Sequence, residues 1–164
     1  MTPIAEDPAG SVDRAVFDAD APERVVDVLY ALISGPAGEA PRWDRFRALF
    51  APGARLMPTN REVDGERVMR VHDVEDYIRV HDAFLREHAF YEKQIAHRVE
   101  RFGRIAHVWS TYTSHAEPDA EPFARGINSI QLHHDGRRWW VVTIFWDSER
   151  DDNPIPQRYL SSVT

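Results

Sequence analysis

One stretch near the end of the chain, RRWWVVTIFW at residues 137–146, is apolar on both sides and restricts the available folds. In a β-strand alternate side chains point to opposite faces, so Trp139 and Val141 face one way while Trp140 and Val142 face the other. Both faces of this strand therefore need cover. The stretch is far shorter than the ~20 apolar residues of a membrane-spanning helix. It predicts a strand that is covered on both faces within a globular protein.

The rest of the chain predicts helices first and strands afterwards. Amphipathic periodicity and capping residues, Asp73 among them, favour three helices, over residues 22–34, 42–50 and 73–88. A short strand is expected around residues 54–58. Long alternating segments predict four strands, over residues 90–101, 104–115, 124–134 and 137–148. This order predicts an α+β fold in which three helices cover one face of a curved antiparallel sheet.

The chain divides into three parts. Residues 1–20 are poor in apolar side chains and without periodicity, which predicts a mobile arm. Residues 21–149 form the single predicted domain, and residues 150–164 a loop-like tail.

Asp135-Gly136 is typical of a two-residue hairpin turn and sets an expected register for the last two strands. Asn128 then lies opposite Thr143, on a face that grades from apolar side chains into polar ones, as the wall of a pocket does. The opposite face carries Trp140, Val142, Ile144 and Trp146, with Ile127 and Ser129 beside them, and three helices cannot cover it as well. We therefore expect a homodimer through that outer face, centred on Trp140, Val142, Ile144, Trp146 and Trp109.

Composition excludes several classes of function. The chain has no cysteine, which excludes disulfides, thiolate-bound zinc and thiol catalysis. A net charge of −7 without a basic run argues against nucleic-acid binding. The acidic N-terminal segment has no apolar core, so we expect no signal peptide, no membrane association and a cytoplasmic protein. Lys93 is the one lysine beside 19 arginines, which suggests a GC-rich bacterial genome.

No metal or cofactor motif is present. His133 and His134 are neighbours in a strand and point to opposite faces, so they cannot easily share an ion. His81 and His88 lack the spacing of a zinc helix, and no Gly-rich phosphate loop occurs. We expect neither a metal nor a cofactor.

The order of these features resembles the NTF2-like (SnoaL-like) superfamily. The resemblance rests on ALFAPGARL (residues 48–56) after a short helix, a third helix, and four long strands that end in a DG-x-x-W hairpin. It implies a cone, a cystatin-like fold that often dimerises through the outer face of its sheet. The superfamily holds isomerases, cyclases, dehydratases and non-catalytic modules, so the resemblance leaves the activity open. In ketosteroid isomerases the aspartate that acts as the general base stands at the position of Pro58, and proline cannot take a proton, which argues against that activity. Polyketide cyclases resemble this chain at another point, since they have an aspartate near the position of Asp147.

His97 and Asp147 are the candidate proton-transfer groups. His97 lies on an apolar alternating face, and histidine gains and loses a proton near neutral pH. The alternative is a core histidine bonded to backbone. Asp147 would face inward if the alternation persists to the end of the strand, and the alternative is a surface carboxylate paired with an arginine.

Tyr112 and Asn128 are the candidates for orienting an oxygen atom of a ligand. Tyr112 can instead be a half-buried aromatic residue, and Asn128 can tie strands together. The remaining candidate walls of the pocket can equally be core: Thr143, Trp43, Phe145, Tyr30, Met57 and Tyr77.

The sequence thus favours a protein that binds a small apolar organic molecule and carries out cofactor-independent acid–base chemistry of the dehydratase, isomerase or cyclase type. A non-catalytic dimeric binding or assembly module is the alternative.

Overall fold

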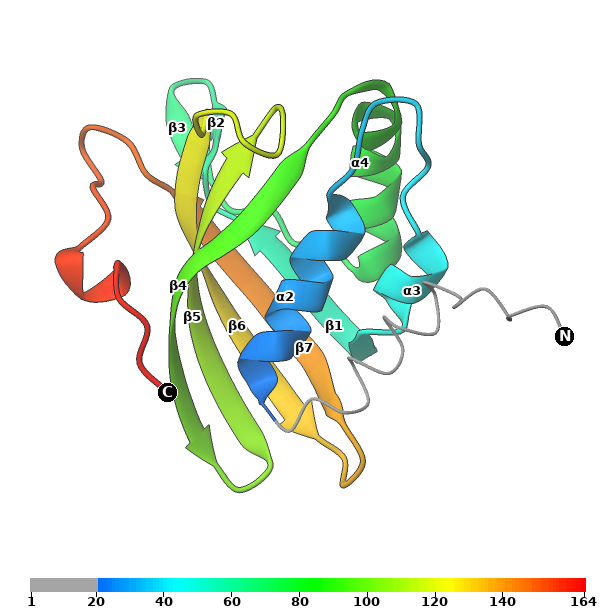
Figure 1. Ribbon diagram of the computed structural model, residues 1–164, viewed down its shortest axis with the longest axis vertical. Helices are drawn as coiled ribbons and strands as arrows, with labels where there is room; N and C mark the ends of the chain where they lie inside the picture. Colours follow the sequence, from blue (N-terminus) through cyan, green and yellow to red (C-terminus); the bar gives the residue numbers. More distant parts are fainter. Residues whose placement is uncertain (1–20) are drawn as a thin grey trace, which may run out of the picture.

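The computed structural model describes residues 21–164 and shows a curved sheet with helices on its concave face (Figure 1). The helices are α2 (Pro22–Ile33), α3 (Trp43–Arg47), α4 (Val74–Glu87) and the 3₁₀ turn η1 (Gln157–Tyr159). The strands are β1 (Phe50–Pro58), β2 (Arg61–Val63), β3 (Glu66–Val68), β4 (Tyr91–Phe102), β5 (Ile105–His115), β6 (Ala124–His134) and β7 (Trp139–Ser148). In this part of the chain no helix is long and apolar enough to cross a membrane.

The main sheet has the strand order β1-β7-β6-β5-β4. The four predicted strands β4 to β7 pair antiparallel with their neighbours in sequence, which confirms that prediction. β1 joins the other edge in parallel with β7, so the sheet is mixed. The short strands β2 and β3 form a separate hairpin.

Local sequence explains the ends of the helices. Asp73 caps α4: its Oδ1 accepts from the Asp76 amide at 2.7 Å, and its own amide donates to Asp76 Oδ2 at 3.3 Å. Pro22 occupies the first turn of α2, where no amide partner is needed. The second helix ends earlier than predicted, because Phe50 already pairs with Val141 of β7.

The hairpin between β6 and β7 differs from the expected two-residue turn. His134 pairs with Trp139, so the loop has four residues. Asp135 stabilises this loop, since its Oδ1 accepts from the amides of Arg137 at 2.7 Å and Arg138 at 3.0 Å. Its Oδ2 accepts from Trp140 Nε1 at 2.8 Å.

A β-bulge then reverses the faces of the second half of β7. Leu132 pairs with Val141, but Gln131 pairs with Thr143, which leaves Val142 as the extra residue. The predicted facing of Thr143 and Phe145 toward the pocket is therefore wrong, as is the predicted outward facing of Ile144 and Trp146.

Solvent exposure agrees with this reversal. The Ile144 side chain is 4% exposed in the core, whereas Phe145 is 41% exposed on the outer face of the sheet. Trp139 and Val141, which precede the bulge, are fully buried as predicted.

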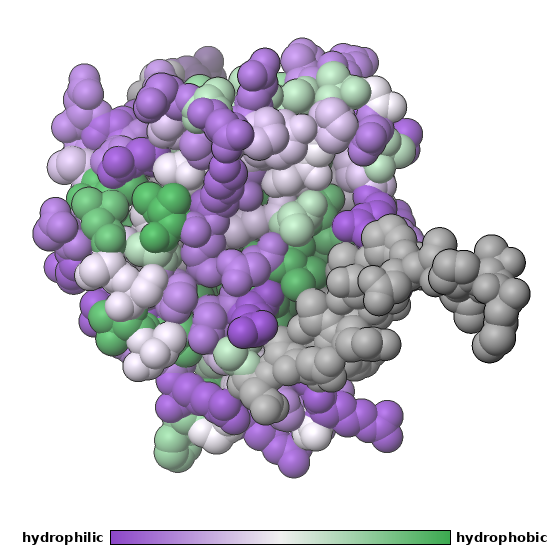
Figure 2. Space-filling model, in the orientation of Figure 1, coloured by the Kyte–Doolittle hydropathy of each residue, from purple (hydrophilic) through white to green (hydrophobic). Residues whose placement is uncertain are grey.

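The C-terminal segment lies across part of the outer face of the sheet (Figure 1). The Tyr159 ring packs on Trp109 with 5.5 Å between centroids, and Thr111 Oγ1 donates to the Tyr159 carbonyl at 2.5 Å. Val163 forms a parallel bridge with Arg98 at the β4 edge. The space-filling view shows apolar residues gathered on this side of the molecule among polar ones (Figure 2). One of the residues predicted for a dimer interface, Trp109, is thus covered by the chain's own tail.

Candidate functional site

A pocket of about 220 Å³ lies between the helices and the concave face of the sheet. Residues from α2, α3, α4 and all five strands of the main sheet surround it, with Phe90 just before β4. Its apolar lining is Leu29, Ile33, Phe46, Leu56, Phe84, Leu85, Phe90, Ile144 and Trp146. Its polar lining is Tyr30, Tyr77, His81, Glu92, Tyr112 and Asn128. We call this cavity the cone pocket.

Glu92 brings a carboxyl group into this largely apolar pocket. It lies near the start of β4, where its amide donates to Ser34 Oγ at 2.9 Å and its Oε2 accepts from Ser114 Oγ at 3.3 Å. Burial raises the pKa of Glu92 to about 7, because a carboxylate in apolar surroundings loses hydration. Glu92 can therefore act as an acid or as a base near neutral pH.

His81 brings an imidazole into the same pocket from α4. Its Nδ1 lies 2.8 Å from the Tyr77 carbonyl oxygen, which can only accept, so Nδ1 carries the proton. Burial lowers the pKa of His81, which favours the neutral ring. The ring also stacks on Tyr77 with 4.0 Å between centroids. Nε2 is then the unprotonated nitrogen, which can accept a proton.

A chain of hydrogen bonds holds the polar groups at the sheet. Asn128 Nδ2 donates to the Tyr30 hydroxyl at 2.8 Å, and that hydroxyl lies 2.7 Å from Ser110 Oγ. All three side chains are buried. Asn128 therefore both lines the pocket and ties β6 to α2, which combines the two alternatives that the sequence left open.

Tyr112 owes its position to a glycine on the neighbouring strand. A Cβ added to Gly126 would stand 2.4 Å from the Tyr112 hydroxyl and 2.6 Å from the Asp147 carbonyl oxygen. Only glycine leaves room for the tyrosine there. Burial raises the pKa of Tyr112 to about 12, so its hydroxyl stays protonated and can donate a hydrogen bond.

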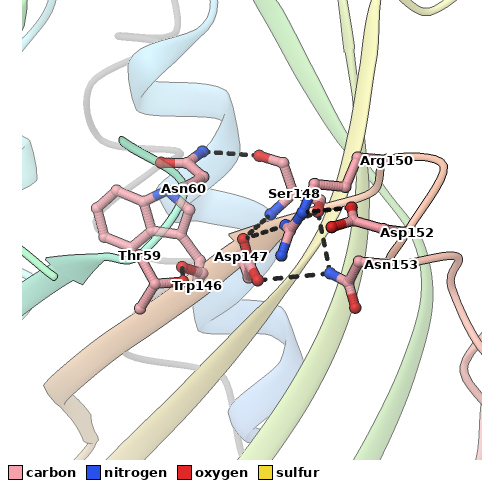
Figure 3. Close-up of polar contacts among 8 residues, drawn as sticks. All are labelled: Thr59, Asn60, Trp146, Asp147, Ser148, Arg150, Asp152 and Asn153. Atoms are coloured by element: carbon pink, nitrogen blue, oxygen red, sulfur yellow. Dashed lines mark hydrogen bonds and ion pairs between the residues drawn. The ribbon is translucent and has the colours of Figure 1, made fainter. Parts of the chain in front are cut away.

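The two predicted proton-transfer residues lie outside the cone pocket. His97 lies on β4 at the edge of the sheet, where its Nδ1 is 3.5 Å from Ser162 Oγ and its ring is near Asp27 of α2. Asp147 lies on the outer face, where its Oδ1 accepts from Arg150 Nη1 at 2.8 Å and its Oδ2 from Asn153 Nδ2 at 3.4 Å (Figure 3). Asp147 is thus the arginine-paired surface carboxylate, because the bulge turns it outward.

Of the predicted walls, Tyr30 and Tyr77 line the pocket, as do Tyr112 and Asn128. Trp43 is core: it packs edge-on against Phe46, and its Nε1 donates to Asp82 Oδ1 at 2.6 Å. Met57 pairs with Phe145 and so belongs to the outer face with it.

The sequence reasoning missed Glu92 and His81 as site residues. A signal for His81 existed, since it lies three residues after Ile78 and four before Leu85, on the buried stripe of α4. Glu92 gave no such signal, because a bulge between Gln94 and Ala96 breaks the alternation of β4. Within residues 21–164 no three side chains of the kinds that bind metals converge on one point.

Comparison with known proteins identifies the fold. No protein family profile and no curated protein matches the chain. A solved structure from Novosphingobium aromaticivorans, described as a candidate scytalone dehydratase, has 12% identity and a TM-score of 0.59, and the match covers 88% of this chain and 97% of that one. A candidate calcium/calmodulin-dependent protein kinase II association domain from Xanthomonas campestris has 17% identity and a TM-score of 0.56, with 84% and 94% covered.

A candidate ketosteroid isomerase from Parabacteroides distasonis has 10% identity and a TM-score of 0.55, with 82% and 92% covered. Other matched structures are described as NTF2-like proteins or as having a cystatin-like fold. Since these identities are low, the likeness is one of fold alone. The chain adopts the NTF2-like, cystatin-like cone fold, as its sequence predicted.

Proposed function

We propose that this protein binds a small, neutral, largely apolar organic molecule in the cone pocket and carries out cofactor-independent acid–base chemistry on it. The observation that carries the proposal is the half-buried Glu92, whose carboxyl pKa is raised to about 7 by desolvation, in the same pocket as His81, whose pKa burial lowers. The lining within residues 21–164 has neither arginine nor lysine, so the pocket suits a ligand without an anionic group.

In a dehydration or isomerisation, His81 Nε2 takes a proton from a C–H bond next to an oxygen-bearing carbon, while protonated Glu92 acts as the general acid on that oxygen. The hydroxyl groups of Tyr112 and Tyr30 donate to that oxygen as negative charge develops. In a dehydration, the C–O bond breaks as the new C=C bond forms, and protonated Glu92 gives its proton to the leaving hydroxyl, which departs as water. His81 and Glu92 then return to their starting states by exchange with solvent.

Deuterium exchange into simple ketones tests this chemistry, because it reports proton abstraction from any ligand that the pocket accepts. The protein is incubated in D₂O with a panel of neutral cyclic ketones, and deuterium uptake at the carbon next to the carbonyl is measured by NMR. General acid–base catalysis contributes on the order of 10²–10⁴ in rate, so we expect Glu92→Gln to lose at least about a hundredfold.

Two variants that alter titratable groups outside the cone pocket are the matched controls. Asp147→Asn and His97→Ala are expected to exchange within about twofold of the unaltered protein, because neither side chain lines the pocket. Full activity in Glu92→Gln, or its loss in Asp147→Asn, would contradict the proposal.

The alternative function is a non-catalytic binding or assembly module. The likeness to a structure described as a kinase association domain favours this alternative. Assembly does not require a carboxyl group and an imidazole in one pocket, so these two groups favour the acid–base function. Ligand binding without exchange at any ketone would support the module.

We also propose that a second copy of the chain covers the free part of the outer face. The strand register places Phe102, Ile105, His133 and Trp140 in one row across β4 to β7. Phe102 is 83% exposed and Ile105 is 61% exposed. This row lies further along the strands than Trp109 and Thr111, which the C-terminal segment covers. Pairing of two such rows about a twofold axis would bury these side chains.

A further inference from the structure

A second depression lies on the other side of Glu92, between α2 and the start of β4. It has a volume of about 370 Å³ and opens to the surface. Its lining is Asp27, Tyr30, Ala31, Ser34, Tyr91, Glu92, Lys93 and Gln94. We call it the α2–β4 groove.

Tyr30 and Glu92 line both the α2–β4 groove and the cone pocket. They form the wall between the two spaces. Among the groups of the proposed mechanism, Glu92 therefore faces both the cone pocket and the α2–β4 groove. His81 and Tyr112 line the cone pocket but not the groove.

The wall of the groove is polar and ordered. Gln94 Nε2 donates to Asp27 Oδ1 at 2.9 Å, which joins β4 to α2. Ser34 Oγ donates to the Tyr30 carbonyl at 2.6 Å and accepts the Glu92 amide at 2.9 Å. Gln94 Oε1 is buried with no hydrogen-bond partner among the described residues.

We propose that the α2–β4 groove is a second entrance through which solvent exchanges protons with Glu92 while a ligand fills the cone pocket. Asp27 and Gln94 are positioning residues that keep its wall in place. This inference rests on the proposed function, because Glu92 must regain its starting protonation state in every turnover. A ligand seated in the cone pocket would shield Glu92 on that side, and the groove leaves the other side open.

Other titratable groups near Glu92 come from three elements. Tyr30 lies on α2, Tyr77 on α4 and Tyr112 on β5, and each is close enough for the Glu92 charge to raise its pKa. Burial also raises the pKa of Asp27 at the outer end of the groove, so this carboxyl takes up a proton more readily than an exposed aspartate.

Carbodiimide labelling measures the access of a reagent to Glu92 from each side. A water-soluble carbodiimide adds to the protonated carboxyl, and glycine ethyl ester then displaces the urea to leave an amide. The rate at Glu92 is measured at pH 6 on the full chain by peptide mass spectrometry, with exposed Glu117 as the internal reference. Ala31→Phe is designed to fill the groove and His81→Trp to fill the cone pocket, since Ala31 lines the groove but not the cone pocket, and His81 lines the cone pocket but not the groove.

We expect His81→Trp alone, which stands in for a filled cone pocket, to slow the labelling of Glu92 less than about twofold relative to Glu117, because the groove stays open. Adding Ala31→Phe to that variant should slow the labelling at least about fivefold, and Ala31→Leu, which is smaller, serves in its place if the phenylalanine variant does not fold. A loss of fivefold or more in His81→Trp alone, or no further loss when either Ala31 substitution is added, would overturn the second entrance. These outcomes leave the proposed function standing, since that depends on deuterium exchange and on Glu92→Gln.

Discussion

At the scale of single residues, the balance of desolvation and hydrogen bonding decides which carboxyl groups can do chemistry. Asp147 lies at the outer face and accepts hydrogen bonds from Arg150 and Asn153. The Glu92 carboxyl has one hydroxyl partner at 3.3 Å, and desolvation outweighs this hydrogen bond, so burial favours its neutral form. The Asp147 carboxyl group therefore holds Arg150 at the outer face, whereas the Glu92 carboxyl group is available for proton transfer in the cone pocket.

This balance predicts a dependence of stability on pH. The pKa of Glu92 in the folded state is about 7, above its ordinary value of 4.5, so the folded state holds the proton more tightly than the unfolded state. The Glu92 contribution is fully present below about pH 4.5 and is lost as the pH rises through 7. Glu92→Gln stays neutral, so we expect its advantage over the unaltered protein to grow by up to about 3 kcal/mol between pH 4.5 and pH 8.

Urea unfolding at a series of pH values measures this difference. Glu75→Gln is the matched control, because Glu75 is an exposed glutamate whose pKa is lowered by its hydrogen bonds to Arg47. That variant should show no such gain at high pH. Parallel stability curves for Glu92→Gln and the unaltered protein would contradict the assigned environment of Glu92.

At the scale of elements, the bulge at Val142 places one half of β7 in the core and turns the other half around. Asp147 and Phe145 lie outside and Ile144 and Trp146 inside because of this single extra residue. The cone pocket depends on it, since Ile144 and Trp146 form part of the lining. Without the bulge, the polar Thr143 would point into the core.

A pair of substitutions tests the register directly. Ile144→Ala removes a side chain that is 4% exposed, so we expect a loss of about 2–5 kcal/mol in the free energy of unfolding. Phe145→Ala removes a larger side chain that is 41% exposed, and the expected loss is under about 1 kcal/mol. Chemical denaturation of both variants measures these losses. A larger loss in Phe145→Ala than in Ile144→Ala would contradict the bulge and support the register of a two-residue turn.

The sequence contained enough to predict the elements but not the faces. Capping by Asp73, apolar periodicity and strand alternation predicted the helices and the four antiparallel strands correctly. The bulge left little trace in the pattern, because the segment from Trp139 to Trp146 is apolar on both faces except at Thr143. Tyr30, Tyr112 and Asn128 lie on elements without that bulge, and they line the cone pocket.

At the scale of the whole molecule, the outer face of the sheet has two kinds of cover. The C-terminal segment packs over Trp109 and Thr111. The row of Phe102, Ile105, His133 and Trp140 lies on the same face beyond that segment. The dimer that we propose would therefore use a smaller and shifted surface compared with the one that the sequence predicted.

Sedimentation at micromolar concentration tests this dimer. The unaltered protein should sediment as a dimer, and the double variant Phe102→Glu, Ile105→Glu should sediment as a monomer, because burying two unpaired carboxylates is costly. The control Val71→Glu, Val80→Glu changes two other exposed apolar side chains, Val71 beside α4 at 53% exposed and Val80 within it at 51%. It should stay dimeric. A strictly monomeric unaltered protein would contradict the interface.

Glu92 is the centre of the proposed chemistry, as a carboxyl group poised to exchange a proton near neutral pH within the cone pocket. Titration of the glutamate side-chain carboxyl carbons by ¹³C NMR tests this role most directly, with Glu92→Gln to assign the signal. We predict one glutamate resonance that titrates near pH 7 and disappears in Glu92→Gln. A Glu92 resonance that titrates near the ordinary glutamate value of 4.5 would contradict this role.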